Sequence, residues 1–568
     1  MPLILQRLLL PHLATGTAPR PASTATRHLH PAWVVVLIST WLATACNVPL
    51  WREVAQLPGQ GSLRGWGFAI AFALIVAAGN AALLSLLAWR WTLKPAATVL
   101  VVMAAFGAYF MLAYGVAIDA SMLTNVLQTD VKEAGDLLNW RMLATVLALA
   151  VPPLWWLLRR PVLRLSTLRH AAHNGLLLAG AIALIVVCLL LVFQDFASTM
   201  RNHTKLRYLI NPLNSVLDTS KLLPLGRDAQ LGASYAGQAK PPLLVLVLGE
   251  TGRSGNFGIN GYERNTTPLL AARTDLVSAR NAWSCGTSTA ASVPCMFSHL
   301  GRTGYEARAA NFESLIDVLH HAGLAVLWVD NQSGCKGVCD RIGETLTSAP
   351  KSPTPDPALC PGGECLDRVM LQDLDTRIAA LPAEQRQRGT VVVLHQMGSH
   401  GPAYYKRSAP DNKKFGPECT STSLQECERQ QVVNAYDNSV VETDFFLDSV
   451  LKWLTAQDSK AQTAMIYVAD HGESLGENNL YLHGLPYSIA PDVQKHVPWI
   501  TWLSPAMQAR TQVATGCLQH ELAERRITHD NYFHSVLGLM DVKTGAYSAG
   551  LDMFAGCRQA AGAARAAG

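Results

Sequence analysis

The sequence predicts a protein of two parts, an N-terminal domain of five transmembrane helices and a C-terminal α/β domain outside the membrane. Charged residues make up only 15% of the 568 residues, whereas a soluble domain has about a quarter. Long runs without any charge are confined to the first 200 residues, and short apolar runs alternating with helical segments begin near residue 241. This composition excludes a wholly soluble or disordered chain. A net charge of +5 without a basic stripe also excludes a nucleic-acid surface.

Five apolar runs have the length that crosses a bilayer, which is roughly 20 residues. They lie near 32–51, 67–89, 96–117, 142–158 and 174–193. The fourth run is the shortest and contains two consecutive prolines. Buried cores of large soluble proteins also contain apolar runs, but five in succession favour a transmembrane domain over residues 32–193.

Lysine and arginine in the short connections indicate which ends face the cytoplasm. Segment 1–31 is basic and lacks acidic residues, and the connections after the second and fourth runs are also basic. The connection 118–141 is acidic and is expected outside. An odd number of spans then places everything after residue 193 outside, so we predict a multi-pass bacterial inner-membrane protein with a periplasmic C-terminal domain.

Ten of the twelve cysteines follow residue 280, in the predicted periplasmic part, where disulfides persist. Four close pairs and one distant pair suggest disulfides, although the sequence does not fix their connectivity: Cys285 and Cys295, Cys335 and Cys339, Cys360 and Cys365, Cys419 and Cys427, Cys517 and Cys557. The alternative is a cytosolic zinc site of four thiolates from residues 335–365. The predicted topology argues against that alternative.

Between the two parts, residues 194–240 interleave aromatic and basic side chains. This pattern fits an amphipathic segment on the outer membrane surface, or equally a linker helix packed on the soluble domain. The tail 558–568 is rich in alanine and glycine, and we expect it to be frayed.

The soluble part over 241–557 contains four nearly continuous aliphatic runs, as in strands covered on both faces. They are 243–249, 324–330, 391–396 and 463–470, and each gap is long enough for a crossover helix. This order predicts an α/β domain with a mainly parallel sheet.

Acidic residues and histidines follow these runs directly, and the carboxyl ends of parallel strands meet at one sheet edge. Glu250 follows the first run, His395 lies at the end of the third and His400 follows it, and Asp470-His471 ends the fourth. Carboxylates with an imidazole suit zinc better than magnesium. Glu250, Asp470 and His471 are therefore predicted to bind a catalytic zinc ion and leave one position open. A single residue of this kind could instead cap a helix or form a salt bridge.

A nucleophile is expected beside such a metal, and residues 284–292 are rich in small and hydroxyl side chains. A loop entering a helix offers backbone N–H groups to a phosphate. Zinc lowers the pKa of a hydroxyl that it binds. The residues alone do not choose between Thr287, Ser288 and Thr289, and an ordinary Ser/Thr helix cap is the alternative.

The motifs resemble the lipid A phosphoethanolamine transferase family, which includes mobile colistin-resistance enzymes and belongs to the alkaline phosphatase/sulfatase superfamily. The matching strings occur in order over nearly the whole chain: Gly249-Glu250-Thr251, Ser284-Cys285-Gly286-Thr287-Ser288-Thr289, Gly334-Cys335-Lys336-Gly337-Val338-Cys339, His395-Gln396-Met397-Gly398, Asp470-His471-Gly472-Glu473 and Tyr481-Leu482-His483-Gly484. The resemblance implies an α/β domain of alkaline phosphatase/sulfatase type.

The resemblance also implies a role for each matching residue. Thr289 is the implied nucleophile and binds zinc together with Glu250, Asp470 and His471. The implied second-metal or substrate-binding residues are His395, His400, His483 and Lys336. The implied ethanolamine-headgroup residues are Asn125, Thr129 and Glu133, whose spacing of four places them on one helical face; a solvated face is the alternative.

The implied activity is zinc-dependent transfer of phosphoethanolamine from phosphatidylethanolamine to a lipid A phosphate through a covalent threonine intermediate. One zinc ion is expected to bind tightly, with a second as an option, in a monomer that binds membrane lipid and no nucleic acid. The product would lower the negative charge of the outer surface and favour resistance to polymyxin and cationic peptides. Three alternatives are another acceptor such as a core sugar, glycerol phosphate transfer, and a non-enzymatic zinc-binding membrane module. A formylglycine sulfatase is disfavoured because neither Cys285 nor Cys295 lies in a Cys/Ser-x-Pro-x-Arg string.

Overall fold

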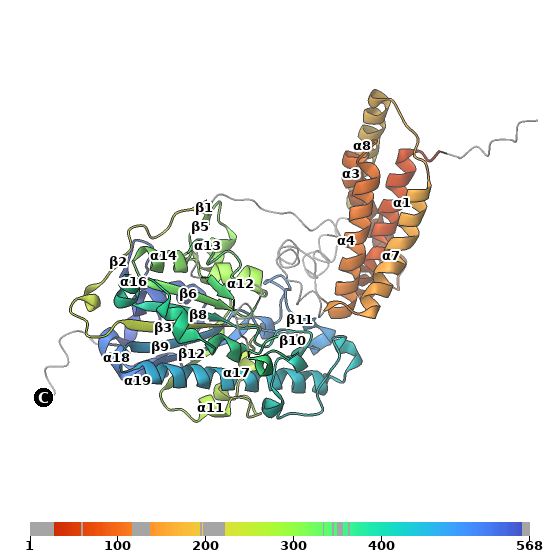
Figure 1. Cartoon of the computed structure of the whole chain (residues 1–568). Coiled ribbons are helices and arrows are strands. Elements are labelled where there is room, and N and C mark those ends of the chain that lie inside the picture. The colour runs from red at the N-terminus through yellow and green to blue at the C-terminus, as the bar shows by residue number, and fades with distance from the viewer. Residues whose placement is uncertain are drawn as a thin grey trace, which may run out of the picture.

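The computed structural model describes residues 28–57, 61–115, 137–192, 196, 222–332, 334–342, 346–348, 356–361 and 364–558. Figure 1 shows two parts, a helical bundle at one side and a larger α/β domain. The fold class predicted from the sequence is confirmed in both parts.

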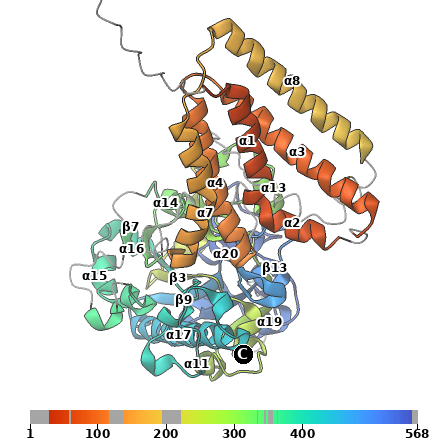
Figure 2. The same ribbon diagram turned by 90° about the vertical axis from the view of Figure 1, so that its right-hand side faces the viewer.

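Among the residues that the structure describes, five helical segments in the bundle are long and apolar enough to cross a membrane. They are α1 (Pro31–Ala43), continued through η1 (Ala45–Asn47) into α2 (Val48–Ala55), then α3 (Leu63–Leu87), α4 (Leu93–Tyr114), α7 (Trp140–Arg159) and α8 (Thr167–Leu191). In Figure 2, α8 lies along α3 and α7 lies along α4. The proline pair of the fourth run lies inside α7, which continues past it.

An eight-stranded sheet in the order β13-β4-β12-β9-β3-β8-β6-β7 forms the centre of the second domain. The four predicted strands are β3 (Pro242–Gly249), β6 (Ala325–Asp330), β8 (Thr390–His395) and β9 (Gln462–Ala469), and they pair in parallel. The remaining strands are β4 (Leu276–Trp283), β7 (Leu346–Ser348), β12 (His496–Leu503) and β13 (Ile527–Thr528). Only β12 runs antiparallel to its neighbours among the strands described in this sheet.

Helices cover both faces of the sheet, so its strands are buried on both sides. Alternate residues of β3 enter two different cores. Leu244, Leu246 and Leu248 pack with α12 (Thr289–Met296), α14 (Leu315–His321) and α20 (Asp530–Leu539). The residues between them pack against α17 (Arg429–Gln457). This three-layer packing explains why each predicted strand is a continuous apolar run.

Smaller elements complete the domain. The short helices are α11 (Pro268–Ala271), α13 (Gly301–Glu306), α15 (Leu374–Ala379), α16 (Ala383–Arg388), α18 (Pro505–Thr511) and α19 (Thr515–Glu521). Three two-stranded sheets pair β1 (Leu222–Leu223) with β5 (Asn311–Phe312), β2 (Gln230–Leu231) with β14 (Val542–Lys543), and β10 (Ser474–Leu475) with β11 (Tyr481–Leu482). Residues 222–240, assigned to the linker from the sequence, thus pair with the α/β domain, and most of the predicted linker lies outside the described residues. The domain boundaries stay a prediction.

The bundle and the α/β domain contact each other at one end of α4 and α7. Tyr109, Tyr114 and Met142 join the hydrophobic core that contains α17. The Tyr114 hydroxyl donates to the carbonyl of Thr422 at 3.5 Å, and Arg141 pairs with Glu426 at 2.5 Å. The end of the bundle formed by the C-terminus of α4 and the N-terminus of α7 therefore contacts the loop before α17.

All ten cysteines of the α/β domain form disulfides. The bonds are Cys285–Cys295, Cys335–Cys339, Cys360–Cys365, Cys419–Cys427 and Cys517–Cys557. The two remaining cysteines, Cys46 and Cys188, are free and buried in the bundle. Because residues 335–365 hold two disulfides, they offer no set of four thiolates.

Candidate metal centre and active site

Three candidate metal ligands meet at the carboxyl ends of β3 and β9, which are neighbours in the sheet. Glu250 follows β3, and Asp470 and His471 follow β9, in a register that pairs Gly249 with Ala469. One ligand atom from each of the three side chains lies within 4.8 Å of the others. Their residues are at most 2% exposed. The parallel pairing of β3 with β9 thus places two carboxylates and an imidazole in one buried cluster.

The hydrogen bonds of Asp470 leave one carboxylate oxygen directed into the cluster. Its Oδ1 accepts from the backbone N–H groups of Thr251 at 3.1 Å and His471 at 2.7 Å. Its Oδ2 is buried, has no hydrogen-bond partner, and lies 3.4 Å from Nε2 of His471. A buried carboxylate oxygen without a donor is costly. The donor set of two carboxylates and one imidazole fits a zinc ion, which would remove that cost.

The orientation of His471 is fixed by its own backbone neighbour. Its Nδ1 lies 2.9 Å from the carbonyl oxygen of Gly472 and must donate to it. In the neutral ring, Nε2 then carries the lone pair, 3.3 Å from Oε1 of Glu250. Metal-binding histidines commonly have this arrangement, with the second ring nitrogen anchored to a carbonyl.

Electrostatics within the cluster also favour a bound cation. Burial, and next the nearby Glu250 carboxylate, raise the pKa of Asp470. Burial alone would raise the pKa of Glu250, but His471 outweighs it and lowers that pKa. Burial alone would lower the pKa of His471, but Asp470 and Glu250 raise it. The two acids therefore demand a positive charge between them, from a metal ion or from the protonated imidazole.

Among the three candidate hydroxyls, the structure brings Thr289 to the cluster. Thr289 is the first residue of α12 and is 6% exposed. Its Oγ1 lies 2.9 Å from Oε2 of Glu250 and 3.3 Å from Nε2 of His471. The Thr287 hydroxyl instead donates to the carbonyl of Leu485 at 2.5 Å. The start of α12 thus presents one hydroxyl to the candidate metal ligands.

A second group of polar side chains lies beside the first. The His483 ring is 4.3 Å from that of His471 and 5.7 Å from that of His400, measured between centroids. Burial lowers the pKa of His400 to about 3, which keeps its imidazole neutral. Glu473 is fully buried, with Oε1 at 3.4 Å from Nδ1 of His483. No role was predicted for Glu473, although it lies two residues beyond His471 in the segment that follows β9.

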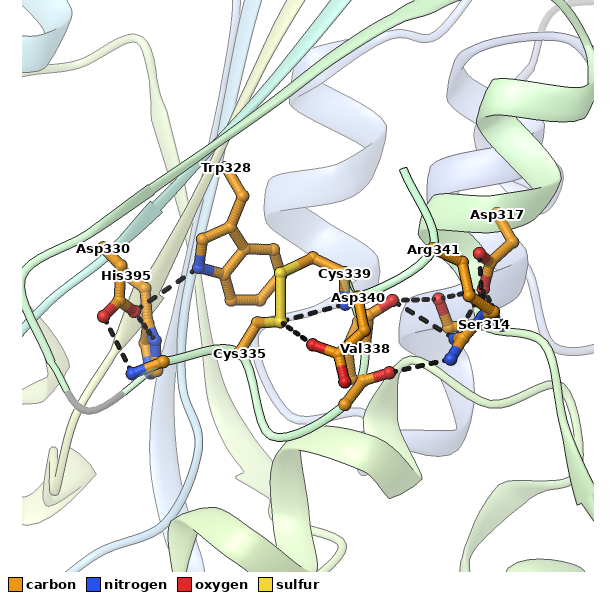
Figure 3. The surroundings of a disulfide bond; sticks show 12 residues. Ser314, Asp317, Trp328, Asp330, Cys335, Val338, Cys339, Asp340, Arg341 and His395 are labelled. Carbon is orange, nitrogen blue, oxygen red and sulfur yellow. Dashed lines mark hydrogen bonds and ion pairs between the residues drawn. A yellow bond between two sulfur atoms is a disulfide. The ribbon is translucent and has the colours of Figure 1, made fainter. Parts of the chain in front are cut away.

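Asp330 contacts both His395, which lies beside it in Figure 3, and Gly334, at the start of the disulfide loop that carries Lys336. Nδ1 of His395 lies 2.7 Å from Oδ1 of Asp330, and the N–H of Gly334 donates to Oδ2 at 2.8 Å. His395 is fully buried at the end of β8, beside β3. Lys336 is half-buried between the bonded cysteines Cys335 and Cys339. Asp330 thus fixes the start of the loop to His395.

The loop is also held at its far end (Figure 3). The Ser314 hydroxyl donates to the carbonyl of Val338 at 2.8 Å, and Arg341 pairs with Asp317 at 2.7 Å. The predicted headgroup residues Asn125, Thr129 and Glu133 lie outside the described residues, and their role stays a prediction.

Comparison with known proteins gives two family matches. The model "Sulfatase" matches residues 242–542, and the model "Phosphoethanolamine transferase EptA/EptB" matches residues 76–224. The phosphoethanolamine transferase EptA of Escherichia coli K12 is 36% identical over 93% of this chain and 97% of its own length. The phosphatidylethanolamine transferase Mcr-1 of Escherichia coli is 35% identical over 91% of this chain and 96% of its own.

The structure is also similar to a solved membrane protein. The integral membrane lipooligosaccharide phosphoethanolamine transferase A from Neisseria meningitidis is 32% identical, with a TM-score of 0.83. That match covers 94% of this chain and 100% of the other. Both parts of the present fold therefore occur together in one related structure.

Proposed function

This chain belongs to the phosphoethanolamine transferase family, and we propose that it transfers phosphoethanolamine from phosphatidylethanolamine to a phosphate of lipid A. The observation that carries the proposal is the position of Thr289, whose hydroxyl lies 2.9 Å from Glu250 and 3.3 Å from His471. A threonine hydroxyl is a weak nucleophile by itself, and a metal ion held by this cluster would activate it toward a phosphodiester.

Glu250, Asp470, His471 and Thr289 would hold one zinc ion in this proposal. When bound, zinc lowers the pKa of a coordinated hydroxyl and offsets negative charge on the transferring group. Within the protein, Oε2 of Glu250 is placed to accept the proton of Thr289. Backbone N–H groups at residues 251 and 471 keep Asp470 fixed while this happens.

The proposed transfer has two successive steps. Thr289 Oγ1 attacks phosphorus, the bond from phosphorus to the glycerol oxygen breaks, and diacylglycerol leaves after taking up a proton. A phosphoethanolamine ester of Thr289 remains. A lipid A phosphate oxygen then attacks the same phosphorus, the bond to Thr289 breaks, and the threonine hydroxyl is restored with a proton.

The second group of side chains is suited to the leaving and entering groups. The His483 ring lies 4.3 Å from the ring of His471 and 5.7 Å from that of His400, and a neutral His400 can donate a hydrogen bond or hold a second zinc ion. Asp330 joins His395 to Gly334 at the start of the loop that carries Lys336, and in this proposal Lys336 and His395 would lie near the phosphate.

The five apolar helices support a setting at a membrane surface, where both lipid substrates are confined. We propose that the chain is a monomer in the bacterial inner membrane, with its α/β domain in the periplasm. Five disulfides in that domain fit an oxidising compartment. The added ammonium would make the outer surface less anionic and favour resistance to polymyxin and cationic peptides.

The test is incubation of the zinc-loaded full-length protein with labelled phosphatidylethanolamine, followed by intact-mass measurement and detection of diacylglycerol. The expected results are an adduct on Thr289 and its disappearance on addition of lipid A. Transfer from phosphatidylglycerol instead would reassign the headgroup. An unmodified zinc-loaded protein and no diacylglycerol would favour a zinc-binding module without catalysis. Mass spectrometry of lipid A from cells with and without the protein would locate the acceptor.

A further inference from the structure

His529 is a fully buried histidine outside the candidate ligand set, and sequence reasoning gave it no role. It lies between β13 and α20 and is 1% exposed. Its backbone N–H donates to the carbonyl of Trp283 at 3.0 Å, beside the segment that leads to Thr289. The chain thus brings a residue from near its C-terminus beneath the start of α12.

Both ring nitrogens of His529 are used, and they join two separate parts of the site. The N–H of Cys285 donates to Nδ1 at 3.1 Å. Nε2 lies 3.1 Å from the carbonyl oxygen of Ala469, the residue before Asp470, and donates to it. Since a backbone N–H is always a donor, Nδ1 must be unprotonated and the ring neutral. Burial also lowers the pKa of His529 to about 3.

Ser292 extends this connection on the same side of α12. Its hydroxyl donates to the carbonyl of Asp470 at 2.5 Å and accepts from the N–H of Gly286 at 3.3 Å. The same hydroxyl oxygen lies 3.2 Å from Nδ1 of His529. The backbone carrying the nucleophile and the backbone carrying the metal ligand therefore meet at one imidazole and one hydroxyl.

We infer that His529 is a positioning residue, which holds the segment 285–292 in register with the end of β9 so that Thr289 meets His471. His529 itself does not contact the reacting atoms. The inference rests on the proposed function because it takes Thr289 as the nucleophile. Its physical basis is the sensitivity of group transfer to placement, since a misplacement of about 1 Å costs about 10²-fold in rate.

The chain offers a matched control in His534, which lies on α20, the helix that begins directly after His529. His534 is 2% exposed, and its Nδ1 accepts from the N–H of Ser548 at 3.1 Å, a contact outside the site. His529→Ala and His534→Ala thus remove the same buried ring. His529→Asn retains an acceptor near the position of Nδ1, whereas His529→Gln retains a donor near the position of Nε2.

The experiment uses the full-length, zinc-loaded protein in detergent and measures two quantities. The first is kcat and KM for diacylglycerol release from phosphatidylethanolamine. For His529→Ala we expect kcat to fall about tenfold to 10²-fold with KM within about twofold, while His534→Ala stays near the wild type and the Asn and Gln variants lie between. The second is hydrogen exchange of the peptide covering 284–297, which should accelerate in His529→Ala and not in His534→Ala.

Three results would decide the matter. Equal kcat in the two alanine variants, or unchanged exchange over 284–297 in His529→Ala, would overturn the positioning role. An inactive wild-type protein with faster exchange only in His529→Ala would refute the proposed function and still support the positioning of this segment. If His529→Ala does not fold, the Asn and Gln variants carry the same comparison, and wild-type kcat in both would overturn the proposal.

Discussion

Replacing Asp470 by asparagine is the sharpest test of the metal centre, because the two residues have the same shape. Asparagine Oδ1 can still accept from the N–H groups of Thr251 and His471. Only the buried Oδ2, which has no hydrogen-bond partner, becomes an amide nitrogen. The variant therefore removes one negative charge and one metal ligand while leaving the backbone contacts in place.

In the metal-free protein, the loss of this charge should change the free energy of unfolding little. Asp470 lies 3.4 Å from Nε2 of His471, so attraction to the protonated ring is about 5 kcal/mol at an effective dielectric constant of about 20. The cluster places a Glu250 oxygen within 4.8 Å, so repulsion is at least about 3.5 kcal/mol by the same relation. The difference between the two energies is at most about 1.5 kcal/mol.

With zinc, the two proteins should differ much more. Zinc at a hundred times its dissociation constant stabilises a folded protein by about 2.7 kcal/mol, and Asp470→Asn loses that gain together with a ligand. Thermal unfolding of the full-length protein with zinc and with chelator, paired with metal content per chain, measures both states. Equal zinc content in the two proteins would refute the assignment of Asp470 as a ligand. An equally large difference in unfolding temperature with chelator would show that the effect is structural.

Three further predictions concern the nucleophile, a disulfide and the domain contact. Thr289→Ala removes the attacking oxygen and one hydrogen bond worth about 1 kcal/mol. Transfer and the covalent adduct should therefore vanish, with little loss of stability. An adduct on this variant in an intact-mass measurement would contradict the assignment of Thr289 as the nucleophile. Thr289→Ser, which keeps a hydroxyl, is its control. The double variant Cys285→Ser and Cys295→Ser removes the disulfide that joins α12 to the segment before it, and should lower the free energy of unfolding by about 2–5 kcal/mol. Reductant should abolish the difference between this variant and the wild type. Unchanged thermal unfolding would argue against the disulfide. Arg141→Ala breaks a half-exposed ion pair with Glu426 and should cost less than about 1 kcal/mol, so a large fall in unfolding temperature would mean that this contact holds the two domains together.

The sequence predicted the elements whose physical signal is continuous along the chain. Five charge-free runs became five helices, and four aliphatic runs became the central parallel strands. Four strands of the sheet were not predicted, and for the two long ones, β4 and β12, the reason is identifiable. β4 contains Arg280 and Asn281, which interrupt its apolar pattern, and β12 contains Pro498 at an irregularity in its pairing with β4. Prolines inside strands usually argue against a strand, and here the irregular register accommodates one.

The residues of the site likewise divide into those that a pattern along the chain could indicate and those that depend on the folded structure. Glu250, Asp470 and His471 could be proposed as a set because each directly follows a strand, and parallel strands end at one edge. The sequence could not distinguish Thr289 from its hydroxyl neighbours, because the first turn of α12 decides which side chain faces the cluster. His529 was not predicted because its contacts depend on how β13 pairs at the edge of the sheet and how α20 packs against the sheet.

The helical bundle and the segment that carries His483 share one hydrophobic core. His483 directly follows β11, and β11 packs in the same core as Tyr109 and Tyr114 of α4. Gly115 ends α4 in the left-handed conformation, where a Cβ atom would come within 3.0 Å of the Leu480 side chain. Glycine is thus required on both conformational and steric grounds. Helix α4 therefore shares one hydrophobic core with the short strand that leads into His483, and the Leu480 side chain that Gly115 approaches lies three residues before that histidine.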